Sequence, residues 1–269
     1  MSGDSHTRLP SCLCTERTLL SADFQNWAEI IKEKRGHLHR KVWEWCFIAQ
    51  ALKEHGMLAA GKSGLGFAVG QEPLSALFAN YGANIIATDL FTADAQANGW
   101  VETAQHADGY QSINLRGICD EEKLHKLVEF KFANMNDISS EFDGRFDFLW
   151  SSCALEHLGS LGHGIQFIYN SMKCLKPGGV AVHTTEYNLS SNDKTIDSGE
   201  TVLYRRRDIE EILDHLKKDG HYIDMNWDAG EGVADGVIDV PPYKHVTHLK
   251  LEIASYVVTS IGLIVRKAK

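Results

Sequence analysis

Two polar segments carry the side chains best suited to proton transfer. The first reads SSCALEHLG (residues 151–159) and contains Glu156 and His157; the second reads HTTEYNLSSND (residues 183–193) and contains His183, Glu186 and Asn188. Because histidine titrates near neutral pH, His157 is the leading candidate for a general base, followed by His183 and Glu186. Glu156 and Asn188 would bind an acceptor through hydrogen bonds. The alternative role of the Glu156–His157 pair is structural, in holding its own turn.

A glycine-containing turn forms a second candidate site, in GLGFAVGQEPLSALFANYGANIIATDL (residues 64–90). Glycine in such a turn allows a ligand to approach the backbone, where any Cβ would collide. Asp89 follows Gly70 by 19 residues and ends an apolar run. An acid at that place accepts hydrogen bonds from ribose hydroxyls in open α/β sheets. The pattern predicts a nucleotide-binding turn, although many α/β proteins share it.

An alternation of apolar runs and helical patterns positions both sites. Strands separated by crossover-sized gaps indicate a parallel sheet with helices on both faces, which is an α/β fold. In the last predicted helix, Asp208 is expected as the N-cap and Glu211 as its capping-box partner. The predicted strands cover residues 64–69, 84–90, 129–135, 145–152, 180–186, 222–227 and 255–267, and the predicted helices cover residues 73–82, 120–128, 164–174 and 204–221.

The chain divides into an N-terminal arm and helix (residues 1–58) and a main domain (residues 59–269). Residues 1–25 have no apolar period, so we expect an irregular arm that orders as a lid over substrate. A helical period over residues 26–58 follows and ends near a glycine. An insertion at about residues 229–250 is too long for a tight turn between the last two strands. We expect it to cover, together with the arm, the acceptor pocket between residues 151–159 and 183–193.

Composition limits the partners. The 269 residues carry a formal net charge of −9 without a block of five or more like charges, so we expect no nucleic acid as the main partner. The six cysteines form no CxxC pair, which is typical of reduced thiols. No signal pattern and no apolar run long enough to cross a membrane is present in the sequence. The expected protein is soluble and cytoplasmic, makes no membrane contact and could form a homodimer.

Three motifs in order carry a family resemblance: AVGQEPLSALFANYGANIIATD, FDFLWSSCALEHL and SMKCLKPGGVAVHTT. Together they span about residues 64–185, and they resemble class I S-adenosylmethionine-dependent methyltransferases. The resemblance implies a Rossmann-like, seven-stranded sheet with helices on both faces and an N-terminal helical arm. It also implies S-adenosyl-L-methionine as the cofactor and S-adenosyl-L-homocysteine as the product.

The turn departs from the family pattern. Aligned without gaps, the family's three glycines fall on Ala68, Gly70 and Glu72, and its usual acid falls on Gly66. A second register places the glycines on residues 66, 68 and 70, but its helix begins two residues late. In the gapless register, Glu72 could face the ammonium group of the methionine moiety in place of the missing acid; the alternative is a helix-start residue, favoured by the helix dipole.

The third strand ends near Asn134, where the family places an acid for the adenine amino group, with Met135 beside the ring and Asp137 as the second choice. The resemblance therefore implies one set of cofactor-binding residues, namely Gly66, Ala68, Gly70, Glu72, Asp89, Leu90, Asn134, Met135 and Ser151.

The expected function is methyl transfer to a small-molecule acceptor, such as a hydroxyl of a sugar or related metabolite. Arg205 and Arg206 could clamp a carboxylate or phosphate of that acceptor. The alternatives are N- or carboxyl-methylation of a small acidic metabolite, and a non-catalytic binding protein. A dinucleotide oxidoreductase is disfavoured, because no hydride-acceptor site is apparent.

Two further groups receive weaker assignments. Cys153 is not expected to act as a nucleophile, since methyl transfer needs no covalent enzyme intermediate. His245 and His248 could bind a metal ion together with His183 or Asp239, but a lone H-x-x-H spacing is mostly coincidence. The sequence therefore predicts no metal site.

Overall fold

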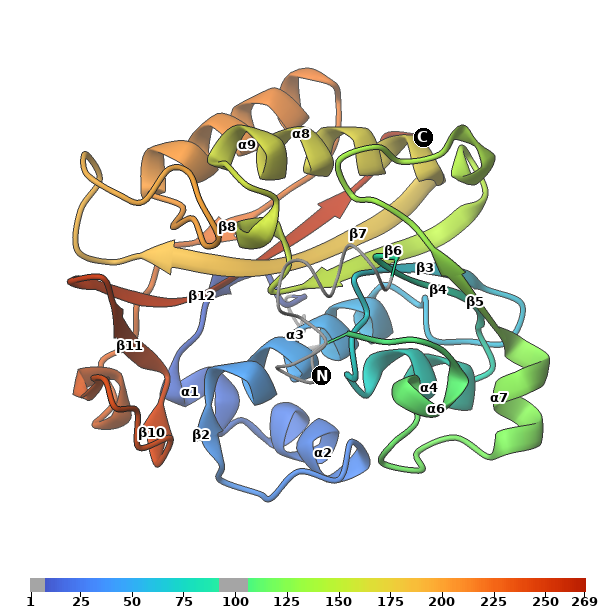
Figure 1. Ribbon diagram of the computed structural model, residues 1–269, viewed down its shortest axis with the longest axis horizontal. Coiled ribbons are helices and arrows are strands. Elements are labelled where there is room, and N and C mark those ends of the chain that lie inside the picture. The colour runs from blue at the N-terminus through green and yellow to red at the C-terminus, as the bar shows by residue number, and fades with distance from the viewer. Residues whose placement is uncertain (1–7, 92–105) are drawn as a thin grey trace, which may run out of the picture.

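A computed structural model describes residues 8–91 and 106–269, which form one large mixed sheet between two layers of helices (Figure 1). From one edge, the sheet runs through β5 (Val128–Phe132), β4 (Asn84–Asp89), β3 (Ser63–Phe67), β6 (Phe146–Ser152), β7 (Leu175–Asn188), β12 (Tyr256–Arg266), β1 (Ser11–Leu13) and β8 (Met225–Asn226). β11 (Lys250–Ile253) pairs with β12 and with β9 (Ile238–Asp239), and β10 (Thr247–His248) pairs separately with β2 (Leu38–His39).

Strand direction fits the predicted doubly covered α/β fold. β5, β4, β3, β6 and β7 are mutually parallel, whereas β12 is antiparallel to β7. Parallel strands align their carboxyl ends at one edge of the sheet, so the loops after β3, β4, β6 and β7 lie at the same edge. The predicted α/β fold with a parallel sheet is confirmed. The sheet has ten strands among the described residues, where the resemblance implied seven.

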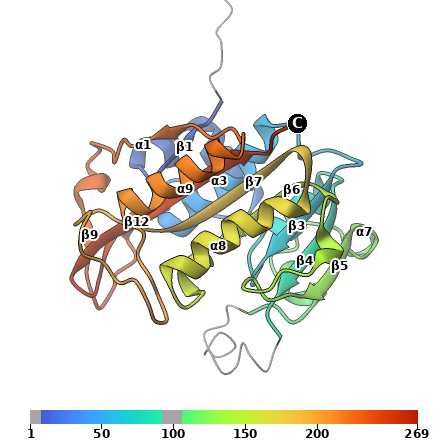
Figure 2. The ribbon, with the colours of Figure 1, turned by 90° about the horizontal axis from the view of Figure 1, so that it is seen from above.

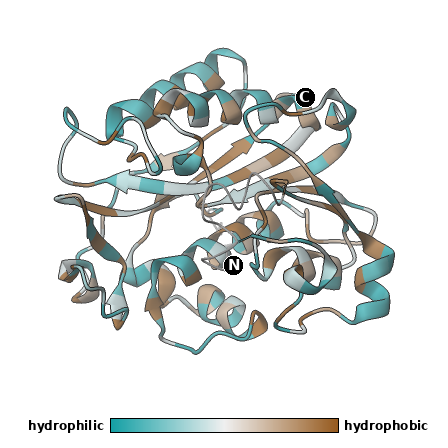
Figure 3. Ribbon diagram, in the orientation of Figure 1, coloured by the Kyte–Doolittle hydropathy of each residue, from teal (hydrophilic) through white to brown (hydrophobic). Residues whose placement is uncertain are grey.

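The two faces of the sheet bury separate apolar cores. Figure 2 shows α8 (Leu161–Ser171) and α9 (Arg206–Lys218) along one face. The opposite face carries α1 (Glu16–Leu19), α2 (Ala22–Ile30), α3 (Arg40–Glu54), α4 (Leu74–Asn80), α6 (Tyr110–Ile113) and α7 (Glu121–Leu127). The strands between them are mostly apolar (Figure 3). Successive residues of β7 point to opposite faces of the sheet. Val180 and Val182 pack in the core under α3, whereas Ala181 packs in the core under α8.

α3 packs closely on the sheet because β12 carries a glycine beneath it. A Cβ at Gly262 would lie 2.3 Å from Cε1 of Phe47 in α3. Phe47 is fully buried, and its ring stacks on Trp43 with centroids 4.8 Å apart. This contact fixes how α3, and the charged residues at its start, lie over the central strands.

The N-terminal prediction was wrong for residues 8–25. They do not form an irregular arm: β1 pairs with both β12 and β8 inside the sheet, and Cys12 and Leu13 are buried. β1 has only three residues, which is too short for an alternating apolar pattern to be detected in the sequence. The remaining part of the predicted arm, residues 1–7, lies outside the described residues, and the domain boundary at residue 58 stays a prediction.

Other local predictions also need correction. α9 begins at Arg206, and its N-cap is Arg205; Asp208 lies at the third helical position, where its carboxylate accepts the Arg205 backbone N–H at 2.8 Å. β7 begins at Leu175, before the start of the strand predicted over residues 180–186, and so includes the Lys-Pro-Gly-Gly segment. The insertion contains two short strands, β9 and β10, and the 3-10 helix η4 (Ala234–Gly236). The other 3-10 helices are η1 (Ser140–Phe142), η2 (Leu155–His157) and η3 (Met172–Cys174).

The close packing of α3 on β12 can be tested by adding one methyl group at Gly262. We expect Gly262→Ala to lower the unfolding free energy by about 1–3 kcal/mol, because the added methyl forces Phe47 or the backbone to move. Denaturant unfolding monitored by circular dichroism would measure this change. Gly236→Ala is the control, since a Cβ there meets nothing within 4 Å. Equal midpoints for the two variants would contradict the close packing of α3 on β12.

Candidate active site

The turn after β3 has a backbone that normally requires glycine. Ala68 has a φ of 47° and Gly70 a φ of 52°, both in the left-handed region. A non-glycine residue there is uncommon, so Ala68 occupies a position where glycine would be unstrained. The geometry agrees with the gapless register, in which Ala68 stands for a family glycine. Gly66 lies earlier, in β3, where a Cβ would fall 2.4 Å from the Trp150 ring.

Asp89 holds this turn from the end of β4. Its Oδ2 accepts the backbone N–H groups of Gly70 and Ala107, both at 3.0 Å, and its Oδ1 accepts that of Leu90 at 2.8 Å. Burial raises the pKa of Asp89, and these backbone amides oppose the rise. A carboxylate offers about four lone-pair sites, so Oδ1 retains capacity for one further donor. The Leu90 carbonyl in turn contacts Nε2 of His106 at 2.7 Å.

Glu72 lies beside the turn with its side chain 15% exposed and one carboxylate oxygen inaccessible to solvent. Its Oε1 accepts the Ser152 hydroxyl at 3.0 Å and lies 3.7 Å from Lys41 Nζ. Among the described residues, no hydrogen bond of normal geometry reaches its Oε2, although the indole N–H of Trp45 lies near enough to lower the pKa of Glu72. Burial raises the pKa of Glu72 to about 7, although Lys41 lowers it. A buried acceptor without a donor is costly, which identifies this oxygen as a candidate ligand contact.

The start of α3 adds residues that the sequence analysis did not assign. Arg40 NH2 pairs with Glu186 Oε1 at 2.5 Å, and Lys41 Nζ pairs with Glu44 Oε2 at 2.9 Å. Glu44 is fully buried and also accepts the Ser260 hydroxyl of β12. Burial alone would lower the pKa of Lys41, but Cys153, Glu44 and Glu72 outweigh it and hold that pKa above its ordinary value.

One sequence signal could have found this group. The segment HRKVWEWC places Arg40, Lys41 and Glu44 on a helix whose other residues are largely apolar. Charged side chains are almost never fully buried unless they are paired, so an acid on an apolar helix face indicates a partner elsewhere.

Glu186 and Glu156 meet Cys153 next to this cluster. One ligand atom from each of the three side chains lies within 4.8 Å of the others. Glu156 Oε2 accepts the Thr185 hydroxyl at 2.8 Å, whereas Glu156 Oε1 and Glu186 Oε2 are buried without a hydrogen bond from any described residue. Burial raises the pKa of Glu186, and Arg40 opposes the rise. Burial also raises the pKa of the Cys153 thiol far above its ordinary value, which agrees with the prediction that it is not a nucleophile.

His183 does not suit the predicted role of a base. It is fully buried on the α8 face, where Nδ1 contacts the Ser151 hydroxyl at 2.8 Å and the ring packs edge-on against Phe167. Burial lowers the pKa of His183 to about 3, so the imidazole is neutral and weakly basic. Ser151, expected to contact the cofactor, is likewise fully buried and contacts His183.

His157 lies on η2, against the loop that precedes α9. Its Nδ1 contacts the Glu200 carbonyl at 2.8 Å and the Thr201 hydroxyl at 3.5 Å. The structure thus brings Glu72, Glu156 and Glu186 to one cluster with Arg40, while His157 contacts a different segment. Its role as a base stays a prediction.

Three predicted acceptor-binding residues are engaged in local structure. Asn188 donates to Lys194 and Thr195 and accepts the backbone N–H groups of Ser190 and Ser191. Arg205 forms a bidentate pair with Asp208, with bonds of 2.7 and 2.9 Å. Arg206 pairs with Glu210 at 2.8 Å and covers the Trp227 ring. These contacts hold the loop after β7 and the start of α9, and a clamp on the acceptor would have to replace the ion pairs of Arg205 and Arg206, so that role stays a prediction.

The end of β5 provides the residues expected beside adenine. Asn134 is exposed and its Oδ1 accepts the Asn136 backbone N–H at 2.9 Å, while Met135 is buried in the core under α8. Their proposed contact with a cofactor stays a prediction.

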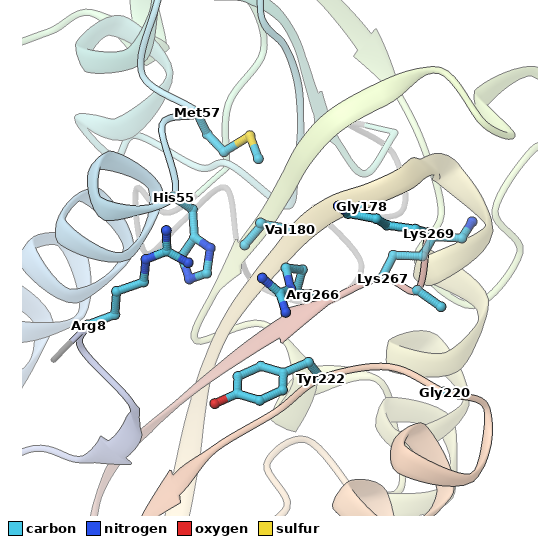
Figure 4. A pocket seen from close by; sticks show the side chains of 11 residues that line it. Arg8, His55, Met57, Gly178, Val180, Gly220, Tyr222, Arg266, Lys267 and Lys269 are labelled. Carbon is cyan, nitrogen blue, oxygen red and sulfur yellow. The ribbon is translucent and has the colours of Figure 1, made fainter.

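A separate cavity of about 430 Å³ lies at the opposite edge of the sheet (Figure 4). It is lined by Arg8, His55, Val180, Tyr222 and Arg266, among others, near the start of β7 and the end of β12. Parallel α/β sheets bind ligands at the carboxyl ends of their strands, and none of the predicted site residues lines this cavity.

Solved structures show what this architecture resembles. A proposed S-adenosylmethionine-dependent methyltransferase from Listeria monocytogenes matches with a TM-score of 0.50 and 13% identity, over 85% of this chain and 98% of that chain. A proposed sarcosine dimethylglycine methyltransferase from Galdieria sulphuraria matches with a TM-score of 0.45 and 15% identity, over 92% and 99%. Magnesium protoporphyrin IX methyltransferase from Synechocystis with bound S-adenosylmethionine matches with a TM-score of 0.44 and 13% identity, over 94% of each chain.

The similarity to the Listeria structure shows that this chain has the class I S-adenosylmethionine-dependent methyltransferase fold, as the sequence motifs implied. No protein-family model matches the chain, and no curated protein matches it in sequence. Within residues 8–91 and 106–269, no helix is long and apolar enough to cross a membrane.

The raised pKa of Glu72 predicts a pH-dependent stability. The unfolded chain ionises this carboxyl near its ordinary pKa of 4.5, whereas the folded chain does so near 7. The folded state therefore binds more protons over this interval, and Glu72 reduces the unfolding free energy as the pH rises from about 5 to about 7. We expect the unfolding free energy of Glu72→Gln not to fall over this interval. Above pH 7 the unfolding free energy of the variant, compared with that of the wild type, should therefore be about 2–3 kcal/mol more favourable than the same comparison at pH 4.5.

Denaturant unfolding of the ligand-free protein at several pH values would measure the difference. Glu122→Gln, on the exposed start of α7, is the control. A pH profile for Glu72→Gln that parallels the wild type would contradict a buried, largely unpaired Glu72.

Proposed function

We propose that this protein is an S-adenosylmethionine-dependent methyltransferase that acts on a small-molecule acceptor. The observation that carries the proposal is the buried, unpartnered Oε2 of Glu72, next to the left-handed turn at Ala68 and Gly70. This oxygen lies at the ligand-binding edge of a methyltransferase fold and, among the described residues, has only the Trp45 indole N–H near it and no hydrogen bond of normal geometry. The ammonium group of the methionine moiety is a donor of the matching charge.

Other groups at the same edge suit the remaining parts of the cofactor. Lys41, whose side chain is 29% exposed, would pair with the methionine carboxylate. The free capacity of Asp89 Oδ1 would accept a ribose hydroxyl, and Asn134 and Met135 would border adenine. The bound cofactor supplies an electrophilic methyl group on a sulfonium. The chain itself must align the acceptor with that methyl group, exclude water and receive the acceptor's proton.

Glu186 is the base that the geometry favours. It is 3% exposed, one of its oxygens is unpartnered among the described residues, and burial has raised its pKa toward the neutral range in which a base works well. Arg40 at Glu186 Oε1 orients the carboxylate, leaving Oε2 to take a proton. Glu156 Oε1 would accept a second hydrogen bond from the acceptor.

Two unpartnered carboxylate oxygens close together suit an acceptor with adjacent hydroxyl groups, as in a sugar or a related metabolite. An acidic acceptor fits this group less well, because the buried carboxylates Glu156 and Glu186 would repel it. The arginines proposed to clamp such an acceptor, Arg205 and Arg206, already pair with Asp208 and Glu210. A non-catalytic binding protein would keep the cofactor site but would need no base.

Cofactor binding can be measured without knowing the acceptor. We expect S-adenosylhomocysteine to bind the wild-type protein in calorimetry, and Glu72→Gln to weaken it by about 10- to 100-fold, because a charge-assisted hydrogen bond contributes about 1.5–3 kcal/mol. Glu122→Gln should bind as the wild type does. No binding by the wild type would overturn the cofactor assignment, and unchanged binding by Glu72→Gln would return Glu72 to a helix-start role.

Catalysis is tested separately at Glu186. With an acceptor selected from a panel of small polyols by S-adenosylhomocysteine release, we expect Glu186→Gln to lower kcat by about 10²- to 10⁴-fold. Its affinity for S-adenosylhomocysteine should stay near the wild-type value. His157→Ala and Glu210→Gln serve as comparisons, the second as a partly exposed control on α9 that pairs with Arg206. A near wild-type kcat for Glu186→Gln together with a large loss for His157→Ala would return the role of base to His157.

A further inference from the structure

Three histidines far apart in the sequence meet beside the candidate active site. His39 ends β2, His248 ends β10, and the two strands pair in parallel with His39 opposite His248 (Figure 1). His245 lies in the loop just before β10, with a left-handed φ of 54°. One ring nitrogen from each histidine lies within 4.8 Å of the other two.

The spacing of the rings agrees with three imidazoles around one ion. The ring centroids of His39 and His248 are 4.6 Å apart, those of His245 and His248 are 4.5 Å apart, and those of His39 and His245 are 5.7 Å apart. A zinc–nitrogen bond of about 2.0–2.1 Å with tetrahedral angles places neighbouring ring centroids roughly 5 Å apart. The His39 ring is stacked on the other two, at 16° to His245 and 29° to His248, so rotation of the side chains would aim the three nitrogens at one centre.

Asp239 prepares one of these rings for a metal ion. Its Oδ2 lies 2.7 Å from Nδ1 of His248, and both residues are nearly inaccessible to solvent. A proton on Nδ1 leaves the lone pair on Nε2, which is the tautomer that a metal requires. Such carboxylate–histidine pairs orient the ligands of protein metal sites. Asp239 also accepts the backbone N–H groups of Lys244 and His245, so it fixes the loop that carries the third ring.

A metal ion would replace one existing contact of His39. Nδ1 of His39 accepts the Lys41 backbone N–H at 3.1 Å. Binding of an ion through Nε2 would place the proton on Nδ1 and exchange this one contact for a metal–nitrogen bond.

We propose that His39, His245 and His248 bind one divalent transition-metal ion, with zinc as the preferred ion, and that Asp239 is the residue that orients His248. Three neutral imidazoles suit zinc, and a set of three protein ligands leaves one coordination position open. This proposal departs from the sequence prediction of no metal, which considered His183 and Asp239 as the partners of His245 and His248.

The site would connect the insertion at residues 229–250 to the start of α3. His39 is the N-cap of α3 and directly precedes Arg40, which contacts Glu186. An ion bound here would hold His245 and His248 of the insertion against the helix start that carries the buried charge cluster. Its open position would lie at the border of the proposed acceptor pocket.

The experiment uses the full chain without a histidine tag, after dialysis against a chelator. We expect one equivalent of Co²⁺ to produce the visible absorption of a tetrahedral or five-coordinate site, and one equivalent of Zn²⁺ to displace it. His245→Ala should weaken Co²⁺ binding at least 100-fold; because His245 is exposed, this variant tests the site without disturbing the core. Asp239→Asn should weaken it by about 10- to 100-fold.

His215→Ala is the matched control, since His215 is partly exposed on α9 and pairs with Asp219. It should bind Co²⁺ as the wild type does, and circular dichroism should show that every variant is folded. Absence of stoichiometric binding of both Co²⁺ and Zn²⁺ at micromolar concentrations would overturn the proposal. Binding that His245→Ala and Asp239→Asn leave unchanged would overturn it equally.

Discussion

The arrangement of this protein depends on a buried charge cluster between the start of α3 and the central strands. Arg40 and Glu44 on the helix meet Glu186 of β7 and Ser260 of β12, with little contact with water. Removing one member of a buried ion pair leaves an uncompensated charge, which costs several kcal/mol. The cluster therefore fixes the rotation of α3 about its axis, while Phe47 on Gly262 fixes its distance from the sheet.

The carboxylates in and beside this cluster have hydrogen-bond or ion-pair partners for only some of their oxygens. Arg40 and Lys41 occupy one oxygen each of Glu186 and Glu44, and unpartnered buried oxygens are left on Glu72, Glu156 and Glu186. A fold selected for stability alone would fill or remove such groups, because each costs desolvation energy. Their concentration at the carboxyl ends of β3, β6 and β7 is what a binding site for charged and hydroxylated ligands requires. Carboxyl groups with a raised pKa, such as those of Glu72 and Glu186, are typical of functional sites when they lie close together.

Segments from the two ends of the chain, namely β1 and the insertion at residues 229–250, lie near the start of α3. β1 enters the sheet beside β12, and η4 of the insertion is tied to α1 through Glu16, which accepts the Ala234 backbone N–H at 2.6 Å. The β2–β10 pair then brings the insertion to the first residue of α3. Segments from both ends of the chain thus surround the start of one helix.

The sequence by itself determined the parallel α/β core and the ligand edge, because strands, crossover helices and the Gly70–Asp89 spacing are local patterns that backbone geometry translates directly into position. It also identified Glu72 and Glu186. Only the tertiary structure decided that Arg205 pairs with Asp208, that His183 is a buried neutral ring, and that Arg40, Lys41 and His39 face the site. The outcomes for His183 and Arg40 follow from burial and from partners distant in the chain, and the Arg205–Asp208 pair follows from where α9 begins. Of these outcomes, only the charged residues on the apolar start of α3 left a signal in the sequence.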